Sequence, residues 1–365
     1  MKIVIFGLTI SSSWGNGHAT LWRGLCKHLT RLGHGIVFYE RNVPYYAGAR
    51  DLFELPGGRL ELFASWHDIR DRAYADVLAA DAAIVTSYCP DAIAATELIV
   101  GRDHALPVFY DLDTPITLAH LRSGESVPYI GTSGLAGFKL VLSFTGGPRI
   151  LEEFRGLGAE NVRPLYGHVD ADVHHPVAPQ PHYRAALSYL GTYSKDRQRA
   201  LENLFVAPAH ERQDLRFLIA GAQYPDDFPW SPNVYFVRHL PPSEHAPFFA
   251  SSRLTLNVTR SAMAEMGWCP SGRLFEAAAC GAPLISDAWA GLEEFLTPNQ
   301  EILLGHTSDG VLAALEMDDS ELQRIARRAQ ERVLEQHSSE RRAHELIALL
   351  EQAAANNRRT QPMEA

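Results

Sequence analysis

Short, uninterrupted apolar runs recur along the first half of the chain, and stretches with helical spacing separate most of them. The runs lie at 2–8, 36–39, 60–64, 82–86, 107–111 and 139–143. Strands that are buried on both faces read as continuous apolar runs, so these segments are expected to be parallel strands. A helix is expected from about His18 to Leu32, ending at Gly33. Alternating strands and helices predict an α/β fold with a doubly wound parallel sheet.

The alternation of apolar runs and helical stretches is interrupted from Asp170 to Tyr183. This segment, DADVHHPVAPQPHY, holds three prolines and three histidines and almost no large apolar residue. We interpret this segment as an interdomain linker; the alternative is a long surface loop within one domain. The strand pattern then restarts, with a helix at 195–207. The expected strands lie at 187–192, 216–221, 234–238, 253–258 and 283–287.

The final third of the chain reads as helical. A capping box at Ser320–Gln323 opens one helix, and a last helix is expected at about 339–354. The predicted domains are therefore 1–172 and 184–337, each Rossmann-like, followed by a helix at 338–355 and a frayed tail at 356–365. Two such domains place the active site in the cleft between them.

Composition narrows the class of protein. The chain has 365 residues, 46% of them apolar, and a formal charge of −10, which is typical of a globular protein and argues against broad nucleic-acid binding. No window approaches 18 uncharged apolar residues, and the N-terminus lacks the layout of a cleavable signal, so we expect a cytoplasmic protein with no transmembrane segment. The cysteines are widely spread and read as reduced thiols rather than a zinc site or a disulfide framework.

The loop after the first strand excludes a dinucleotide cofactor. Its glycines, Gly7, Gly15 and Gly17, do not form G-x-G-x-x-G, and a loop of about ten residues is too long for that motif. A phosphate-binding G-x-x-x-x-G-K-[ST] loop and a nucleophile elbow are also absent from the sequence.

The run from Gly267 to Gly281 is a stronger candidate for an anion-binding site than the loop after the first strand. It opens with turn residues and continues as a helix. Pro270 and Ser271 suit its first positions, so its N–H groups and dipole form a ready site for phosphate. The first turn of a helix usually favours acidic residues, but here it carries Arg273. An arginine at this position is expected if its side chain binds an anion. The carboxylate of Glu276 can accept hydrogen bonds from the two hydroxyls of a ribose. The alternative is a surface i,i+3 ion pair.

The segment RLFEAAACGAPLISD resembles the E-A-x-A-x-G-x-P signature of glycosyltransferases with the GT-B fold. More closely, the chain resembles the CgeB-like (spore-maturation-type) branch of these enzymes. The matching blocks are GNGHAT (15–20), YDLDTP (110–115), LSFTGG (142–147), YLGTYSKDRQ (189–198), LNVTR (256–260), the Arg273–Gly281 helix and GLEEF (291–295). At Cys269 the chain departs from many retaining members, which carry a second glutamate that contacts the donor sugar.

The resemblance implies two Rossmann-like domains, with the nucleotide-sugar donor on the C-terminal domain, the acceptor on the N-terminal domain, and the last helix crossing back onto the N-terminal domain. It implies that Glu276 lies at the ribose and that no cofactor or metal is bound. Arg and Lys side chains and helix N–H groups then stabilise the charge that develops on the leaving diphosphate. The candidates, any of which can also be an ordinary surface group, are Lys195, Arg197, Arg260 and Arg273, with the N–H groups at Ser271 and Gly272. The backbone of His239 and Leu240 is expected to read the nucleobase.

In the N-terminal domain His18 follows the glycines Gly15 and Gly17 at the start of a helix. A neutral imidazole there takes the acceptor proton or hydrogen-bonds the donor; the alternative is a helix cap or a solvent contact. Asp111 and Asp113 follow a strand at the same edge and can bind acceptor hydroxyls or act as base, although Asp113 also reads as a helix cap. His174 and His175 show no third ligand at metal-like spacing.

These features predict a hexosyltransferase-like enzyme that moves a sugar from a nucleoside-diphosphate sugar to a small-molecule or glycan acceptor. A nucleotide-sugar epimerase or hydrolase of the same fold, and a non-catalytic nucleotide- or sugar-binding module, are the alternatives. The sequence does not specify the base, the sugar, the acceptor, the stereochemistry or the oligomeric state.

Overall fold

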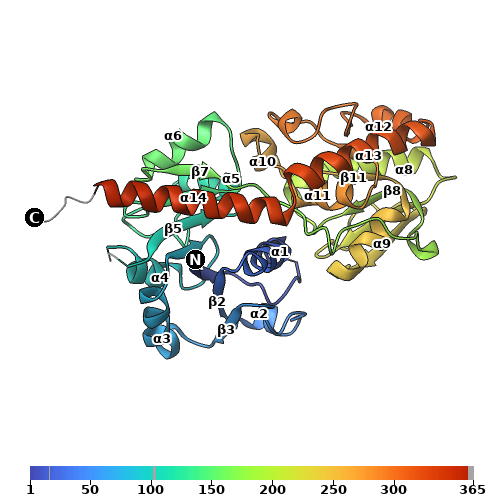
Figure 1. Ribbon diagram of the computed structural model, residues 1–365. Helices are drawn as coiled ribbons and strands as arrows, with labels where there is room; N and C mark the ends of the chain where they lie inside the picture. Colours follow the sequence, from blue (N-terminus) through green and yellow to red (C-terminus); the bar gives the residue numbers. More distant parts are fainter. Residues whose placement is uncertain (16, 102–103, 361–365) are drawn as a thin grey trace, which may run out of the picture. The chain divides into compact units, whose positions relative to one another are not determined.

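A computed structural model describes residues 1–15, 17–101 and 104–360 of the chain (Figure 1). The chain divides into two compact units, Met1–Tyr166 with the segment from Ser339 onward, and Gly167–Ser338. The segment 170–183, predicted to be a linker, therefore lies inside the second unit. The reason is local: the Val169 N–H donates to His337 O at 3.0 Å, and His174 is fully buried, so this stretch packs as part of that unit.

The first unit holds a parallel sheet with the strand order β3-β2-β1-β4-β5-β6-β7. The strands are β1 (Lys2–Gly7), β2 (Gly35–Arg41), β3 (Arg59–Phe63), β4 (Ala82–Thr86), β5 (Leu106–Asp111), β6 (Leu140–Ser143) and β7 (Val162–Pro164). The helices are α1 (Gly17–Arg31), α2 (Pro44–Ala47), α3 (Trp66–Leu78), α4 (Ala92–Ile99), α5 (Thr114–Arg122) and α6 (Pro148–Gly156). The chain reverses its direction of strand addition between β1 and β4, which is where ligands bind in sheets of this kind.

The last helix, α14 (Ser339–Thr360), belongs to the first unit and packs on α1 and β5 (Figure 1). Its apolar face is fully buried at Leu346 and Leu350. The predicted frayed tail at 356–365 is wrong for residues 356–360, which continue the helix; residues 361–365 lie outside the described part of the chain.

The second unit holds a parallel sheet with the order β10-β9-β8-β11-β12-β13. The strands are β8 (Ala185–Leu190), β9 (Phe217–Gly221), β10 (Val234–Arg238), β11 (Ser252–Asn257), β12 (Leu284–Ser286) and β13 (Leu303–Leu304). The remaining helices and turns are η1 (Pro181–Tyr183), η2 (Lys195–Arg197), α7 (Gln198–Leu201), η3 (Glu202–Val206), α8 (Ala207–Glu211), η4 (Pro242–Glu244), α9 (His245–Ala250), α10 (Ser261–Met266), α11 (Gly272–Ala279), η5 (Leu292–Glu294), α12 (Ser308–Leu315) and α13 (Asp319–Gln336).

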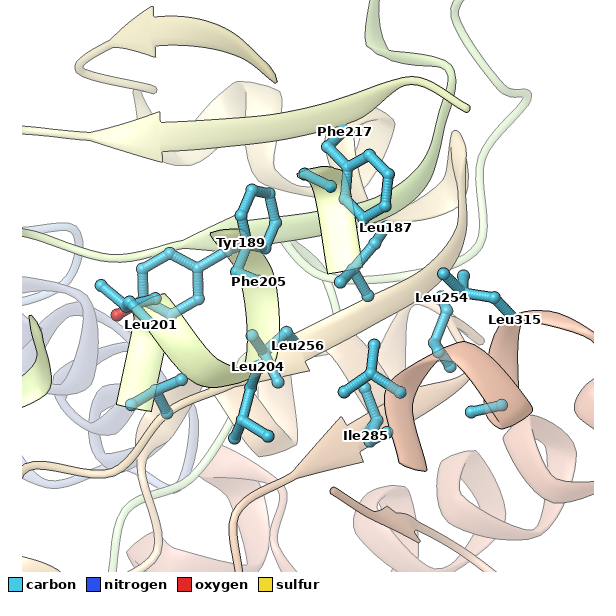
Figure 2. Close-up of a cluster of buried hydrophobic side chains, with 14 of the residues drawn as sticks. Leu187, Tyr189, Leu201, Leu204, Phe205, Phe217, Leu254, Leu256, Ile285 and Leu315 are labelled. Atoms are coloured by element: carbon cyan, nitrogen blue, oxygen red, sulfur yellow. The ribbon is translucent and has the colours of Figure 1, made fainter. Parts of the chain in front are cut away.

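One face of this sheet carries a buried apolar cluster (Figure 2). Leu187 and Tyr189 of β8 and Leu254 and Leu256 of β11 pack there with Phe205 from the segment that follows β8. Since both central strands bury side chains on this face, the cluster fixes the positions from which the loops at their carboxyl ends start.

The helix expected at 195–207 is present and extends to Glu211, but its hydrogen-bonding pattern changes along its length. It begins as the 3-10 turn η2, continues as α7, widens into the π turn η3 and closes as α8. Pro208 has no N–H and its ring clashes with the carbonyl of the preceding turn, which accounts for the wider turn just before it.

Among the described residues, no helix is long and apolar enough to span a membrane. The cysteines Cys26, Cys89, Cys269 and Cys280 are all described, and each is buried and free of a disulfide.

Candidate functional site

The carboxyl ends of β8 and β11 lie side by side in the second unit, at the point where its strand order reverses. The backbone is packed closely at this edge: a Cβ on Gly221 would lie 2.0 Å from the Gly191 carbonyl oxygen, and Gly221 has φ +152°. Glycine is therefore required where the loop after β8 passes the end of β9. The predicted donor-binding side chains come from the loops along this edge and from α11.

Helix α11 begins as the sequence predicts. Ser271 is its N-cap, and the Ser271 Oγ accepts a hydrogen bond from the Arg273 N–H at 3.3 Å. Arg273 lies in the first turn with 31% of its side chain exposed, and it pairs with Glu276, of which only 8% is exposed. The i,i+3 ion pair therefore forms, but its carboxylate is buried rather than on the surface.

Two histidines from distant segments complete a buried cluster around Glu276. His174 Nε2 lies 3.9 Å and His245 Nδ1 lies 3.7 Å from Glu276 Oε2, and these two ring nitrogens lie 3.3 Å apart. Burial by itself raises the pKa of Glu276, but the Arg273 guanidinium outweighs it, and the pKa is held at about 2. Burial, reinforced by Arg273, lowers the pKa of His245 to about 3, and burial also lowers that of His174. The cluster is a carboxylate and a guanidinium beside two neutral imidazoles.

The same three residues form a set of metal donors that the sequence interpretation missed. His174, His245 and Glu276 each offer one atom, and these atoms lie within 4.8 Å of one another. Two histidines and a carboxylate suit zinc. However, the Arg273 guanidinium already lies among them: it pairs with Glu276, and its Nη1 is 3.3 Å from His245 Nδ1. A second cation would have to displace that side chain, so we assign no metal here.

The other predicted phosphate ligands differ in their surroundings. Lys195 is exposed in η2. Arg197 donates to the Thr192 carbonyl at 3.0 Å, and among the described residues its buried Nε has no hydrogen-bond partner. Arg260 donates to Asp196 at 3.3 Å, so part of its charge is already compensated. Arg197 therefore differs from the other two in having a buried guanidinium N–H without a hydrogen-bond partner in the part of the chain that the structure describes.

The predicted nucleobase readers, His239 and Leu240, follow β10 directly. The His239 N–H donates to the Gly221 carbonyl at 2.9 Å, and the Leu240 carbonyl lies 3.3 Å from His245 Nε2. These two backbone groups are therefore held within the fold.

A pocket of about 700 Å³ lies beyond the ends of β11 and β12, which the sequence interpretation did not identify. Asp287 is its most buried carboxylate; it accepts from the Thr259 N–H at 2.9 Å and from Thr259 Oγ1 at 3.0 Å. Burial raises the pKa of Asp287. The pocket is lined by Asp196, Arg199, Ala200, Glu202, Asn203, Thr259, Ser261, Ala264 and Asp287. This acidic lining suits hydroxyl groups better than phosphates.

Cys269, the position at which the resemblance predicts a second glutamate, offers no carboxylate. Cys269 is fully buried, and the neighbouring Trp268 donates its indole N–H to Glu294 Oε1 at 2.6 Å.

In the first unit, the predicted His18 and Asp113 meet. His18 lies in the first turn of α1, and its Nε2 is 3.0 Å from Asp113 Oδ2. Asp113 is the N-cap residue of α5, yet its carboxylate pairs with the imidazole. Asp111 is fully buried and accepts from the Asp113 N–H at 3.1 Å, and burial raises its pKa to about 6. The Asp111 carboxylate therefore holds the backbone of Asp113 in place.

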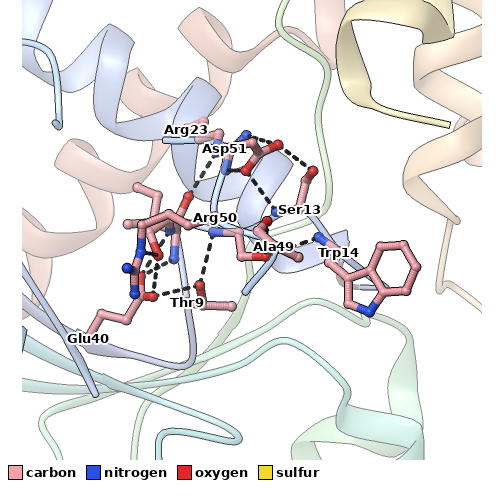
Figure 3. Close-up of polar contacts among 11 residues, drawn as sticks. Thr9, Ser13, Trp14, Arg23, Glu40, Ala49, Arg50 and Asp51 are labelled. Atoms are coloured by element: carbon pink, nitrogen blue, oxygen red, sulfur yellow. Dashed lines mark hydrogen bonds and ion pairs between the residues drawn. The ribbon is translucent and has the colours of Figure 1, made fainter. Parts of the chain in front are cut away.

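The loop between β1 and α1 is held by a buried carboxylate that the sequence interpretation missed (Figure 3). Glu40, at 0% exposure, accepts from Thr9 Oγ1 at 2.9 Å and from the N–H groups of Ile10 and Ser11 at 2.8 and 2.9 Å. Asp51 adds a second anchor, because it accepts from the Ser13 N–H at 3.1 Å. These bonds fix the chain that leads to His18.

The glycines predicted beside His18 lie on that same loop. Gly15 has φ +58°, and Gly17 begins α1, while Asn16 between them lies outside the described residues.

Comparisons with known proteins bear on the family resemblance and on the fold. A family model described as "Glycosyl transferase-like" matches residues 197–348. No protein with a curated description matches the chain.

Several solved structures share the fold. Sucrose-phosphate synthase from Thermosynechococcus elongatus is similar over 97% of this chain and 99% of its own, with TM-score 0.71 and 14% identity. Anabaena Alr3699/HepE in complex with UDP and glucose is similar over 96% of this chain and 100% of its own, with TM-score 0.65 and 13% identity. The α,α-trehalose 6-phosphate synthase from Burkholderia multivorans covers 98% and 99%, with TM-score 0.62 and 14% identity. The chain thus has the GT-B fold, two Rossmann-like parallel-sheet domains, and its residues 197–348 are glycosyl transferase-like.

Proposed function

We propose that this protein is a glycosyltransferase that moves a hexose-type sugar from a nucleoside-diphosphate sugar to an acceptor hydroxyl. The observation that carries the proposal is the start of α11: a capped helix, with Arg273 in its first turn and the buried Glu276 one turn on, inside the region that matches the family model. The Anabaena relative in complex with UDP and glucose supports UDP-glucose as the first donor to test.

The donor is held by the second unit. The N–H groups of Ser271 and Gly272 at the start of α11, together with the side chains of Arg273 and Arg197, bind the diphosphate, with Lys195 and Arg260 as further cations. Glu276 accepts hydrogen bonds from the ribose hydroxyls, and backbone groups at His239 and Leu240 other than the His239 N–H and the Leu240 carbonyl contact the base. These cations stabilise the charge that develops on the diphosphate as it leaves, so we propose that no metal ion is needed.

The first unit provides the groups for the acceptor. In the transfer, the acceptor oxygen bonds to the anomeric carbon, the bond from that carbon to the diphosphate breaks, and the acceptor proton goes to a base. A His18 ring that donates its Nε2–H to Asp113 carries its basic lone pair on Nδ1, and Asp113 stabilises the charged ring. We propose that His18 takes this proton or hydrogen-bonds the donor sugar. The resemblance to the CgeB-like branch remains part of the proposal.

Turnover distinguishes the candidate functions. Purified protein is incubated with UDP-glucose and with other nucleotide sugars, each with and without a panel of glycan and small-molecule acceptors, and the products are read by mass spectrometry. Transfer gives nucleoside diphosphate and a glycosylated acceptor, and we expect both products to form at the same rate when EDTA is present. An isomerised nucleotide sugar formed without acceptor indicates an epimerase, and free sugar alone indicates a hydrolase.

A further inference from the structure

The clearest unassigned feature of the donor-binding unit is His245, a buried imidazole that the roles proposed above do not use. It begins α9, only 4% of its side chain is exposed, and both of its ring nitrogens lie near polar groups of the proposed nucleotide site. Its Nε2 is 3.3 Å from the Leu240 carbonyl oxygen, and its Nδ1 is 3.3 Å from Arg273 Nη1.

The partners fix the tautomer. A carbonyl oxygen only accepts, so the Leu240 contact places the proton on Nε2. A guanidinium only donates, so the Arg273 contact requires a lone pair on Nδ1. One neutral tautomer satisfies both contacts. Burial and the neighbouring Arg273 lower the pKa of His245 to about 3, which keeps the ring neutral at physiological pH.

Arg273 needs such an anchor. A cation in the first turn of a helix is opposed by the positive end of the helix dipole, and a side chain that is 31% exposed retains rotamer freedom. Glu276 holds the guanidinium from within α11, and His245 holds it from α9, a separate element. His174, which is fully buried and comes from the segment before β8, also places its Nε2 3.3 Å from His245 Nδ1, so in this tautomer the Nδ1 lone pair faces two donors, Arg273 Nη1 and His174 Nε2.

We propose that His245 is a positioning residue for the diphosphate: it holds the Arg273 guanidinium through Nδ1 and joins it through Nε2–H to the Leu240 segment that follows β10. This inference rests on the proposed donor site, because Arg273 matters to affinity only if a diphosphate binds there. His245 itself touches no substrate.

Two substitutions separate the two ring contacts. His245→Asn places an amide oxygen near the position of Nδ1 and retains an acceptor for Arg273. His245→Gln places its amide near the position of Nε2, so it retains a donor for Leu240 and loses the Arg273 contact. Binding of UDP and of uridine is measured by calorimetry on wild type and on both variants, after thermal melts have shown that each is folded.

We expect His245→Gln to weaken UDP about tenfold, equivalent to about 1.4 kcal/mol, and uridine less than twofold. His245→Asn should keep UDP within about threefold of wild type. Equal weakening by both variants, an equal loss of UDP and uridine, or no loss in His245→Gln would overturn the assignment. Absence of UDP binding by wild type would instead overturn the proposed donor site, and this inference with it.

A second measurement does not depend on the shape of the amide variants. In an Arg273→Ala background, the change of His245 to Gln should alter UDP affinity no further, because its effect passes through the guanidinium. A full, additive tenfold loss in that background would show that His245 acts by another route.

Discussion

Replacing Glu276 with Gln tests the buried ion pair at the centre of the proposed donor site. The change keeps the size of the side chain and removes its charge. The pKa of Glu276 is about 2, against its ordinary value of 4.5, and at 1.36 kcal/mol per pKa unit this difference corresponds to about 3 kcal/mol of stability. Arg273 is partly exposed and can be rehydrated, so we expect a loss of about 2–3 kcal/mol, or a Tm lower by about 5–10 °C.

The same substitution should weaken nucleotide binding. Hydrogen bonds to a charged group contribute about 1.5–3 kcal/mol, and those to a neutral group about 1, so losing the charge at the ribose should raise the Kd for UDP by a factor of about 2 to 30. Calorimetric titration with UDP measures this change, and differential scanning fluorimetry measures Tm.

A matched control lies in the other unit. Arg342 and Glu345 form an i,i+3 pair on α14, again with one buried partner. Glu345→Gln should lower Tm modestly and leave the Kd for UDP unchanged. If Glu276→Gln lowers Tm but binds UDP within twofold of wild type, as the control does, then Glu276 supports the fold alone and the ribose assignment is refuted.

Three further predictions follow from the same contacts. His18→Ala should reduce turnover about 100-fold or more with UDP affinity unchanged, and Asp113→Asn should reproduce much of that loss; equal turnover in wild type and His18→Ala would exclude a role in proton transfer. The pKa of Glu276 is lowered from 4.5 to about 2, and that of His245 from 6.5 to about 3. The free energy of unfolding, measured by urea titration, should therefore fall as the pH drops from about 6.5 to 2, and it should fall less steeply in Glu276→Gln. The same dependence of this free energy on pH in wild type and Glu276→Gln would contradict this. Arg273→Ala should let Zn²⁺ raise Tm through the emptied donor set, whereas wild type should not respond; equal responses would show that the guanidinium does not occupy that position.

The fold was predictable because buried parallel strands leave uninterrupted apolar runs in the sequence. Strands such as β4 and β10 have the predicted bounds. The two missed strands, β7 and β13, are too short to stand out, and β7 carries a proline and an exposed arginine. The sequence pattern predicts the helix that begins at Lys195 but not its π-helical stretch before Pro208.

Two kinds of proximity were predictable from the sequence: residues that share one helix, and residues such as His18 and Asp113 that follow strands at the same edge of a sheet. Ser271, Arg273 and Glu276 lie within one turn and a half, so helical spacing alone brings them together. His174 and His245 are 71 residues apart and reach Glu276 through burial in the tertiary fold, which leaves no spacing signal. Glu40 was missed for the same reason, since its partners lie on the loop after β1.

The measurement that tests the account most directly is a thermal-shift panel of UDP, GDP, TDP, ADP, CMP and NAD on wild type and Glu276→Gln. A ligand at a hundredfold excess over its Kd stabilises the native state by about 2.7 kcal/mol, which corresponds to several degrees. We predict that one nucleoside diphosphate raises the Tm of wild type by that amount, that the shift is much smaller in Glu276→Gln, and that NAD has no effect. A shift with NAD alone, or with none of these ligands, would contradict the account.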